Sequence, residues 1–205
     1  MALLCDSGNV PAASLVVTVE SRDGKPLAGA VLTADPQGQR VPAPAPVSTI
    51  VDQVDLAFVP DVIVVPTGSA ISFPNSDAVS HQVYSFSTAR RFQLPLYRGK
   101  KYPPVVFDQP GVVTLGCNIH DNMLGYVIVT SAPFFGRTDG HGRWTIPTVA
   151  GGRYRLLLWH PLLNEQGNTL QREIEVPSDG TRLTWRLDRA LKPPPLKSRP
   201  HSWDY

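Results

Sequence analysis

Short runs in which hydrophobic and polar residues alternate recur along most of the chain. Residues 14–20 and 28–33 are the first two, and a polar turn containing Asp23-Gly24 separates them. A period of two is typical of β-strands that bury one face. Further strand-like runs follow at 81–86, 105–107, 112–115, 125–129, 138–146, 151–161, 172–177 and 182–187. No stretch shows a convincing helical period, so the pattern predicts an all-β chain built as a β-sandwich.

Proline and glycine divide these runs. The chain holds 21 Pro and 16 Gly, and Pro disrupts helices but is tolerated in turns and at sheet edges. Residues 36–46 contain four prolines and are expected to form a linker or an extended edge. Residues 50–75 hold two or three strands between proline-containing turns. The basic residues 89–102 are expected to form an irregular surface excursion, and residues 131–137 a link.

Composition narrows the class of protein. Hydrophobic residues make up 42% of the 205 residues, which argues against a disordered chain. The 19 basic and 17 acidic residues give a net charge of +2, which is too balanced to indicate nucleic acid or an anionic membrane as a partner. No apolar run approaches the ~18–20 residues of a transmembrane helix.

The two ends of the chain show no strong pattern of their own. Residues 1–16 lack the basic and apolar regions of a complete secretory signal peptide, and would fit the remnant of one if the start lies upstream. The Pro-rich tail, residues 191–205, cannot bury much surface and is expected to be disordered or extended.

The candidate chemistry lies between two of the predicted strands. Cys117, His120 and Met123 form a C-x2-H-x2-M pattern on the short loop between residues 112–115 and 125–129. Thiolate, imidazole and thioether ligands suit copper, and two His and one Cys with a weak axial Met form the blue-copper electron-transfer site. The set needs one more histidine. His81, 36 positions before Cys117 and ahead of another strand, is the candidate.

Each of these residues has an ordinary structural explanation when taken alone. A lone Cys is usually a buried small hydrophobe, a loop His is common, and Met often fills a core. Cys5 could in principle pair with Cys117 in a disulfide. Zinc is the competing ion, with Asp121 as a possible ligand, but a Met ligand would be unusual for zinc. The joint spacing between two strands favours a metal site with copper as the cofactor.

The segments FPNSDAVSHQVYSF and GCNIHDNMLGYVIV resemble the cupredoxin family, and the short ligand loop is most similar to that of amicyanin. The middle of the chain also resembles the plastocyanin-like proteins known as methylamine utilization proteins. The resemblance covers roughly residues 50–130. It implies a Greek-key β-sandwich with one type 1 copper held by four ligands, which are His81, Cys117, His120 and Met123.

The same resemblance implies two supporting residues. Asn75 would brace the ligand loop, and the backbone N–H of Gln82 would donate to the Cys117 sulfur. Many cupredoxins have Asn directly after the first His, and Gln82 departs from that pattern. Groups around the ligands tune such centres strongly.

The flanking strands resemble a different family. Residues 15–34 look like the first hairpin of a carboxypeptidase regulatory-like (transthyretin-like) domain, and residues 137–161 like its later strands. Two-stranded units are marginal in water, so one half needs the other. We therefore expect a discontinuous second β-sandwich at 14–46 and 132–190, with the cupredoxin domain at 47–131 inserted. The alternative is that the N-terminal strands join the cupredoxin sheet.

These patterns predict a periplasmic type 1 copper protein that carries single electrons between redox protein partners, and not an enzyme. Three other functions stay open. The chain could be a copper-binding or delivery protein, a copper enzyme with an open axial position, or a β-sandwich binding module whose metal site is incidental. No nucleophile–base arrangement or phosphate loop is present in the sequence to support hydrolysis or phosphoryl transfer.

Overall fold

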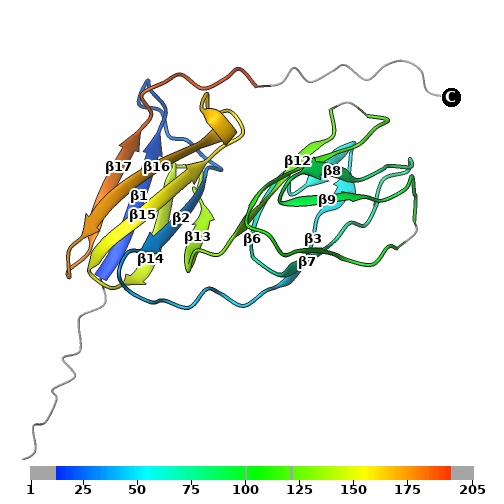
Figure 1. Ribbon diagram of the computed structural model, residues 1–205. Helices are drawn as coiled ribbons and strands as arrows, with labels where there is room; N and C mark the ends of the chain where they lie inside the picture. The colour runs from blue at the N-terminus through cyan, green and yellow to red at the C-terminus, as the bar shows by residue number, and fades with distance from the viewer. Residues whose placement is uncertain (1–12, 100, 121, 195–205) are drawn as a thin grey trace, which may run out of the picture. The chain divides into compact units, whose positions relative to one another are not determined.

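The computed structural model describes residues 13–99, 101–120 and 122–194. In these ranges the chain forms β-strands joined by turns and loops (Figure 1). The one helical segment in the described part is a single 3₁₀ turn, η1 (Gln166–Asn168). The prediction of an all-β fold is confirmed. Cys5, Asp121 and residues 195–205 lie outside the described residues, as does the predicted signal remnant up to residue 12.

The chain divides into two compact units, which we call unit 1 and unit 2. Of the described residues, unit 1 contains 13–41 and 136–191, and unit 2 contains 42–135 and 192–194. These divisions fall within a few residues of the predicted domain limits at 46/47 and 131/132. The assignment of unit 1 to the carboxypeptidase regulatory-like family stays a prediction.

Unit 1 is a pair of sheets made from both ends of the chain. Its three-stranded sheet has the order β14 (Arg143–Val149), β1 (Ala13–Glu20), β17 (Thr181–Arg186). Its four-stranded sheet has the order β13 (Phe134–Arg137), β2 (Val31–Pro36), β15 (Gly152–Trp159), β16 (Thr169–Val176). Alternate residues of the central strand β1 are buried at Leu15, Val17 and Val19, whereas four successive residues are buried at the start of β2. The N-terminal strand thus depends on C-terminal strands for its partners on both sides.

Unit 2 contains a larger sheet, a smaller sheet and a hairpin. The five-stranded sheet has the order β6 (Val62–Pro66), β12 (Leu124–Thr130), β11 (Gly111–Gly116), β8 (Tyr84–Ser87), β9 (Arg90–Gln93). The three-stranded sheet has the order β10 (Val105–Phe107), β7 (Ser69–Ser72), β3 (Ser48–Ile50). The hairpin joins β4 (Asp52–Val54) to β5 (Ala57–Val59). A single core of aromatic and aliphatic side chains fills this unit, and Cys117 and Met123 belong to it.

Several details differ from the sequence-based expectation. Residues 50–75 hold four strands, β4 to β7, where two or three were expected. Residues 89–102 include strand β9, which pairs with β8 at the edge of the larger sheet. Exposed charged residues suit an edge strand, and they also made this segment look like a loop. Residues 131–137 include β13, and β8 begins at Tyr84, three positions after His81.

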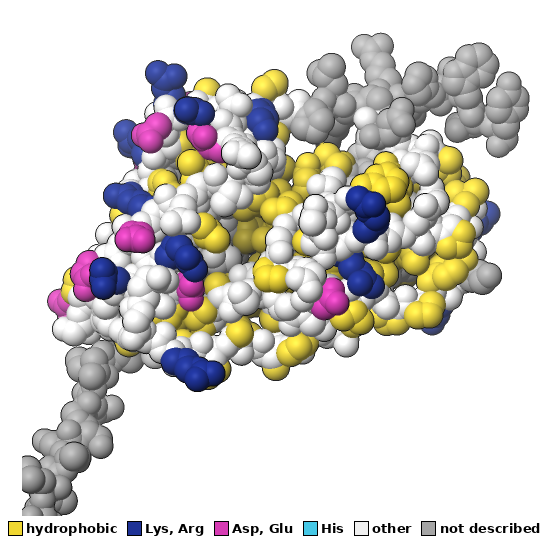
Figure 2. All heavy atoms as spheres, viewed as in Figure 1, with side chains coloured by type: hydrophobic (Ala, Val, Ile, Leu, Met, Phe, Trp, Pro, Cys, Tyr) yellow, Lys and Arg dark blue, Asp and Glu magenta, His cyan; other side chains and the backbone are white. Residues whose placement is uncertain are grey.

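The surface carries both signs of charge. On the face shown in Figure 2, basic and acidic side chains are scattered singly among polar and hydrophobic ones. No helix in the described ranges has the length and hydropathy that crossing a membrane requires.

Candidate metal centre

The loop that contains Cys117 is held at both ends by paired strands. Gly116 ends β11 and lies opposite Leu124, the first residue of β12, so the two ends of the loop are neighbours across the ladder. Within the loop the Met123 N–H donates to the His120 carbonyl at 3.0 Å, which closes a turn. The paired strands therefore fix where the three predicted ligands of this loop can lie.

His81 reaches the same place from a segment ahead of β8. It forms an isolated antiparallel bridge with Tyr97, with N–H to carbonyl distances of 3.0 Å and 2.9 Å in the two directions. Its side chain is fully buried. The bridge to Tyr97 therefore holds His81 in place, because no strand begins at His81 itself.

The structure brings three of the four predicted ligands together. One ligand atom each from His81, Cys117 and His120 lie within 4.8 Å of one another. The two Nδ1 atoms are 3.0 Å apart, and the Cys117 sulfur is 3.9 Å from His120 Nδ1. Two ligands on one ion, at about 2.0–2.3 Å from it, lie no more than about 4.4 Å apart. The His81–His120 and Cys117–His120 distances fall within this limit, and the donor set of two imidazoles and a thiolate suits a transition-metal ion.

A carboxylate decides which nitrogen of His81 can bind a metal. Asp77 Oδ2 lies 2.6 Å from His81 Nε2. Burial would raise the pKa of Asp77, but hydrogen bonds from the Leu56 N–H, from His81 and from the Asp55 N–H outweigh it and hold the pKa below its ordinary value. An ionised carboxylate only accepts hydrogen bonds, so Nε2 carries a hydrogen, and in the neutral ring Nδ1 is then the nitrogen with the lone pair.

His120 is the more exposed of the two histidines, since its side chain is only partly buried. Burial, and then the nearby His81, lower the pKa of His120 below its ordinary value, against an opposing effect of Asp77. The imidazole is therefore neutral near pH 7. Neutral imidazole is the form that binds metals.

Met123, the fourth predicted ligand, is 2% exposed and packs in the core of unit 2. Its burial fits both a thioether ligand and a core side chain, so its role stays a prediction. The residues around it differ in exposure: Leu124 is 42% exposed and Ile119 is 52% exposed. The Cys117 loop thus has a buried side with sulfur atoms and an exposed apolar side next to His120.

The resemblance implies Asn75 and Gln82 as residues that support the predicted ligands, and the structure shows hydrogen bonds made by the side chains of both. Asn75 donates through its side-chain amide to the Val79 and Tyr97 carbonyls at 3.0 Å and 2.8 Å, and so braces the segment before His81. The Gln82 side chain accepts from Asn118 at 2.7 Å, which ties the His81 segment to the Cys117 loop. A bond from the Gln82 backbone to the Cys117 sulfur stays a prediction.

Sequence reasoning missed Asp77 and Tyr97. Asp77 lies four positions before His81, a spacing visible in the sequence but not specific. Tyr97 is buried, accepts a hydrogen bond from Gln53 and donates to the Phe73 carbonyl. Burial is the main cause that raises the pKa of Tyr97 to about 12. Tyr97 therefore serves as a neutral brace behind the bridge that holds His81.

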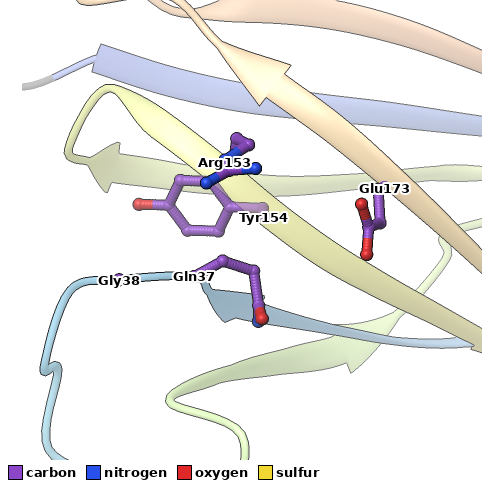
Figure 3. Close-up of a pocket in the computed structure, with 5 residues that line it drawn as sticks. All are labelled: Gln37, Gly38, Arg153, Tyr154 and Glu173. Carbon is purple, nitrogen blue, oxygen red and sulfur yellow. The ribbon is translucent and has the colours of Figure 1, made fainter.

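Unit 1 contains a pocket of about 300 Å³ that is lined by Gln37, Gly38, Arg153, Tyr154 and Glu173 (Figure 3). The Tyr154 hydroxyl points away from Glu173 and donates to the Ala150 carbonyl at 2.9 Å. Arg153 and Glu173 come from the neighbouring strands β15 and β16. None of the predicted metal ligands lines this pocket, and all four belong to unit 2.

No model of a known protein family and no curated protein matches the sequence. Among solved structures, the chain is similar to a Cu-containing nitrite reductase from Thermus scotoductus SA-01, with 26% identity over 47% of this chain and 25% of that chain and a TM-score of 0.37. It therefore spans about a quarter of that enzyme.

Two smaller proteins are similar as well. A purple cupredoxin from Nitrosopumilus maritimus is 21% identical over 40% of this chain and 99% of its own, with a TM-score of 0.36. A reduced mutant of amicyanin is 19% identical over 48% of this chain and 99% of its own, with a TM-score of 0.38.

Proposed function

We propose that the protein is a type 1 copper protein that carries single electrons between redox protein partners. The observation that supports it is the convergence of the Cys117 sulfur with the Nδ1 atoms of His81 and His120 at one small site. Two imidazoles and one thiolate with a weak thioether from Met123 are the donor set of blue-copper centres. When bound, copper would supply reversible one-electron chemistry. The rigid strands that hold the ligands would keep them in place in both oxidation states.

The ligands differ in exposure, and this difference suggests where electrons pass. His81 and Cys117 are buried, whereas His120 is partly exposed, and Ile119 and Leu124 near it in the sequence have exposed side chains. We assign electron entry and exit to the His120 edge, with these apolar residues as part of the docking area. The basic residues Arg90, Arg91, Arg98 and Lys101 would steer an acidic partner, because surface charge mainly changes the rate of encounter.

An electron carrier fits this chain better than a copper enzyme, because Met123 would fill the position that a small substrate needs. A periplasmic location is the part of the proposal that rests on the family resemblance alone. The methylamine utilization name belongs to the similar proteins, and the proposal does not depend on it.

The test is to add Cu(II) to the purified protein and record the visible and EPR spectra. We expect an intense blue or purple absorption and a narrow copper hyperfine splitting, because both arise from a copper–thiolate bond. Cys117→Ser should abolish both signals. Cys5→Ser is the matched control, since it removes the other thiol of the chain and should change neither signal.

Other results would point to other functions. A colourless or weak complex in the wild type would contradict the proposal and favour a binding module with zinc or no metal at this loop. A blue centre whose spectrum changes on adding azide would favour an enzyme with an open copper position. Rapid loss of Cu(I) to a chelator of micromolar affinity would favour copper delivery.

A further inference from the structure

The carboxylate of Asp77 connects a predicted metal ligand to a turn in another part of unit 2. Oδ2 accepts from His81 Nε2 at 2.6 Å and from the Leu56 N–H at 3.0 Å, and Oδ1 accepts from the Asp55 N–H at 2.6 Å. The Asp77 N–H itself donates to the Asn75 side-chain oxygen at 3.0 Å. All these contacts together fix the carboxylate between the β4–β5 turn and the imidazole.

The turn that binds Asp77 has an unfavourable backbone. Asp55 and Leu56 have φ values of 52° and 59°, in the left-handed region that residues with a Cβ rarely adopt. This conformation directs two successive N–H groups at one carboxylate, and such pairs of amides are binding sites for anions. The hydrogen bonds to Asp77 offset the cost of the turn. A strained turn of two non-glycine residues is therefore maintained around a carboxylate that contacts His81.

The contact has a direct consequence for His81. With its hydrogen at Nε2, the ring directs the Nδ1 lone pair toward His120 Nδ1, 3.0 Å away. The ring is fully buried and Asp77 is 11% exposed, so water cannot easily replace the carboxylate. Metal-bound histidines commonly donate their second N–H to such a partner, which fixes their orientation and makes them stronger donors.

The negative charge of Asp77 would also affect the reduction potential of a bound copper ion. A negative charge one imidazole away from a copper ion stabilises Cu(II) more than Cu(I), because the attraction grows with the charge of the ion. Little solvent surrounds Asp77 to screen this attraction. The effect on the reduction potential is therefore downward.

We propose that Asp77 is the positioning residue of the metal centre. Its carboxylate, anchored by the Asp55 and Leu56 N–H groups, fixes the His81 tautomer that points Nδ1 at the metal and lowers the reduction potential of copper held there. The effect on the reduction potential rests on the proposed copper function, whereas the tautomer of His81 is a property of the metal-free protein.

The first experiment uses the metal-free protein. Imidazole ¹⁵N chemical shifts at neutral pH distinguish the two tautomers, and we expect wild-type His81 to be protonated at Nε2. Asp77→Ala should lose this single tautomer and show a mixture. Asp52→Asn is the matched control. Asp52 accepts hydrogen bonds from Gln53 and Ser76 in the same region, and none of its bonds goes to His81.

The second experiment uses the copper-loaded protein. Asp77→Asn keeps the size of the side chain and removes its charge, so it remains useful if Asp77→Ala folds poorly. Loss of a carboxylate behind a ligand typically weakens metal binding by about 10–100-fold. If only the affinity for Cu(II) falls and the affinity for Cu(I) is unchanged, each tenfold loss of Cu(II) affinity raises the reduction potential by about 59 mV. Asp52→Asn should shift the potential far less, although it removes the same charge nearby.

The outcomes separate the two proposals. A mixed His81 tautomer in Asp77→Ala together with a raised potential in Asp77→Asn supports the role of Asp77. An unchanged tautomer, or a potential that shifts equally in the Asp77→Asn and Asp52→Asn variants, overturns it. If the wild type gives no copper–thiolate spectrum, the electron-transfer function fails, and the tautomer measurement still decides whether Asp77 positions His81.

Discussion

The Nδ1 atoms of His81 and His120 lie 3.0 Å apart, although 39 positions separate the two residues in the chain. His81 is held from behind by Asp77 and by the bridge to Tyr97, and His120 is carried by a turn between two paired strands. Two imidazoles that face each other through ring nitrogens gain at most one hydrogen bond. A metal ion bound by both rings and by the Cys117 sulfur would gain three ligands from the same arrangement.

The two histidines should contribute unequally to stability without metal. His81→Ala removes a fully buried ring and leaves Asp77 without one of its donors, so we expect the free energy of unfolding to fall by about 2–4 kcal/mol. His120→Ala removes a partly exposed ring and should cost no more than ~1 kcal/mol. Urea unfolding with a chelator present measures both. Equal losses would contradict the view that His81 is part of the core and His120 is not.

Units 1 and 2 should respond separately to a change in one of them. Gly142 has a φ of 70°, and a Cβ there would lie 2.5 Å from the Val19 carbonyl oxygen, a backbone atom that cannot rotate away. Gly142→Ala should therefore destabilise unit 1 by about 2 kcal/mol or more. Calorimetry should show that unit 1 unfolds at a lower temperature in the variant than in the wild type. The copper spectrum of unit 2 should persist above that temperature.

The same turn provides the control for that change. A Cβ added at Gly140 would meet no heavy atom within 4 Å, and the residue has no left-handed φ, so Gly140→Ala should leave both transitions in place. Simultaneous loss of the copper spectrum and of unit 1 in Gly142→Ala would argue against two independent domains, and against the insertion that the sequence predicts.

The turn between β13 and β14 gives a dependence on pH. Asp139 Oδ1 accepts from the His141 and Arg143 N–H groups, each at 2.9 Å. The bond from Arg143 is the largest cause that lowers the pKa of Asp139 below its ordinary value. The folded state then binds fewer protons than the unfolded state, so the stabilisation is present above about pH 4 and disappears as the pH falls through the folded pKa.

The variant Asp139→Asn tests this dependence, since the amide oxygen can still accept both N–H groups but does not titrate. We expect it to be less stable than the wild type at neutral pH, and the difference to shrink as the pH falls below about 4. Urea unfolding curves across this range measure the difference. A gap that widens on acidification would show the opposite linkage and rule out this explanation.

The parts of the site that the sequence predicted are those that lie close together in the chain. Cys117, His120 and Met123 share one loop between two obvious strands, so their spacing alone indicated a metal site. His81 lies on a second, distant segment, so its position ahead of a strand made it only a candidate, which the resemblance to cupredoxins then supported. As metal ligands, all four stay predictions, while the proximity of His81, Cys117 and His120 is a finding.

Asp77 could not be predicted, because its role depends on the β4–β5 turn, whose residues Asp55 and Leu56 lack the Gly or Asn expected at left-handed positions.

The fold, too, was predictable from the sequence in some parts and not in others. Alternation identified most strands, but β9 is an edge strand that begins with two arginines, and its short hairpin with β8 has no Gly or Asn at the turn that would have indicated it.

Met123 offers the sharpest remaining test of the ligand set. Its side chain is buried, so Met123→Leu should keep the packing and change the stability of the metal-free protein by less than ~1.5 kcal/mol. Even a long axial bond donates electron density, which stabilises the more highly charged Cu(II) more than Cu(I). Loss of the axial ligand should therefore raise the reduction potential while the copper–thiolate absorption persists.

The variant Met123→Gln provides the opposite change at the same position. An amide oxygen is a harder donor than a thioether and favours Cu(II), so the potential should fall below that of the wild type. Voltammetry of the three proteins should therefore give the order Leu variant, wild type, Gln variant from high to low potential. Identical potentials in all three would show that the Met123 sulfur lies outside the copper coordination sphere. Met123 would then be only a core residue beneath a site of His81, Cys117 and His120.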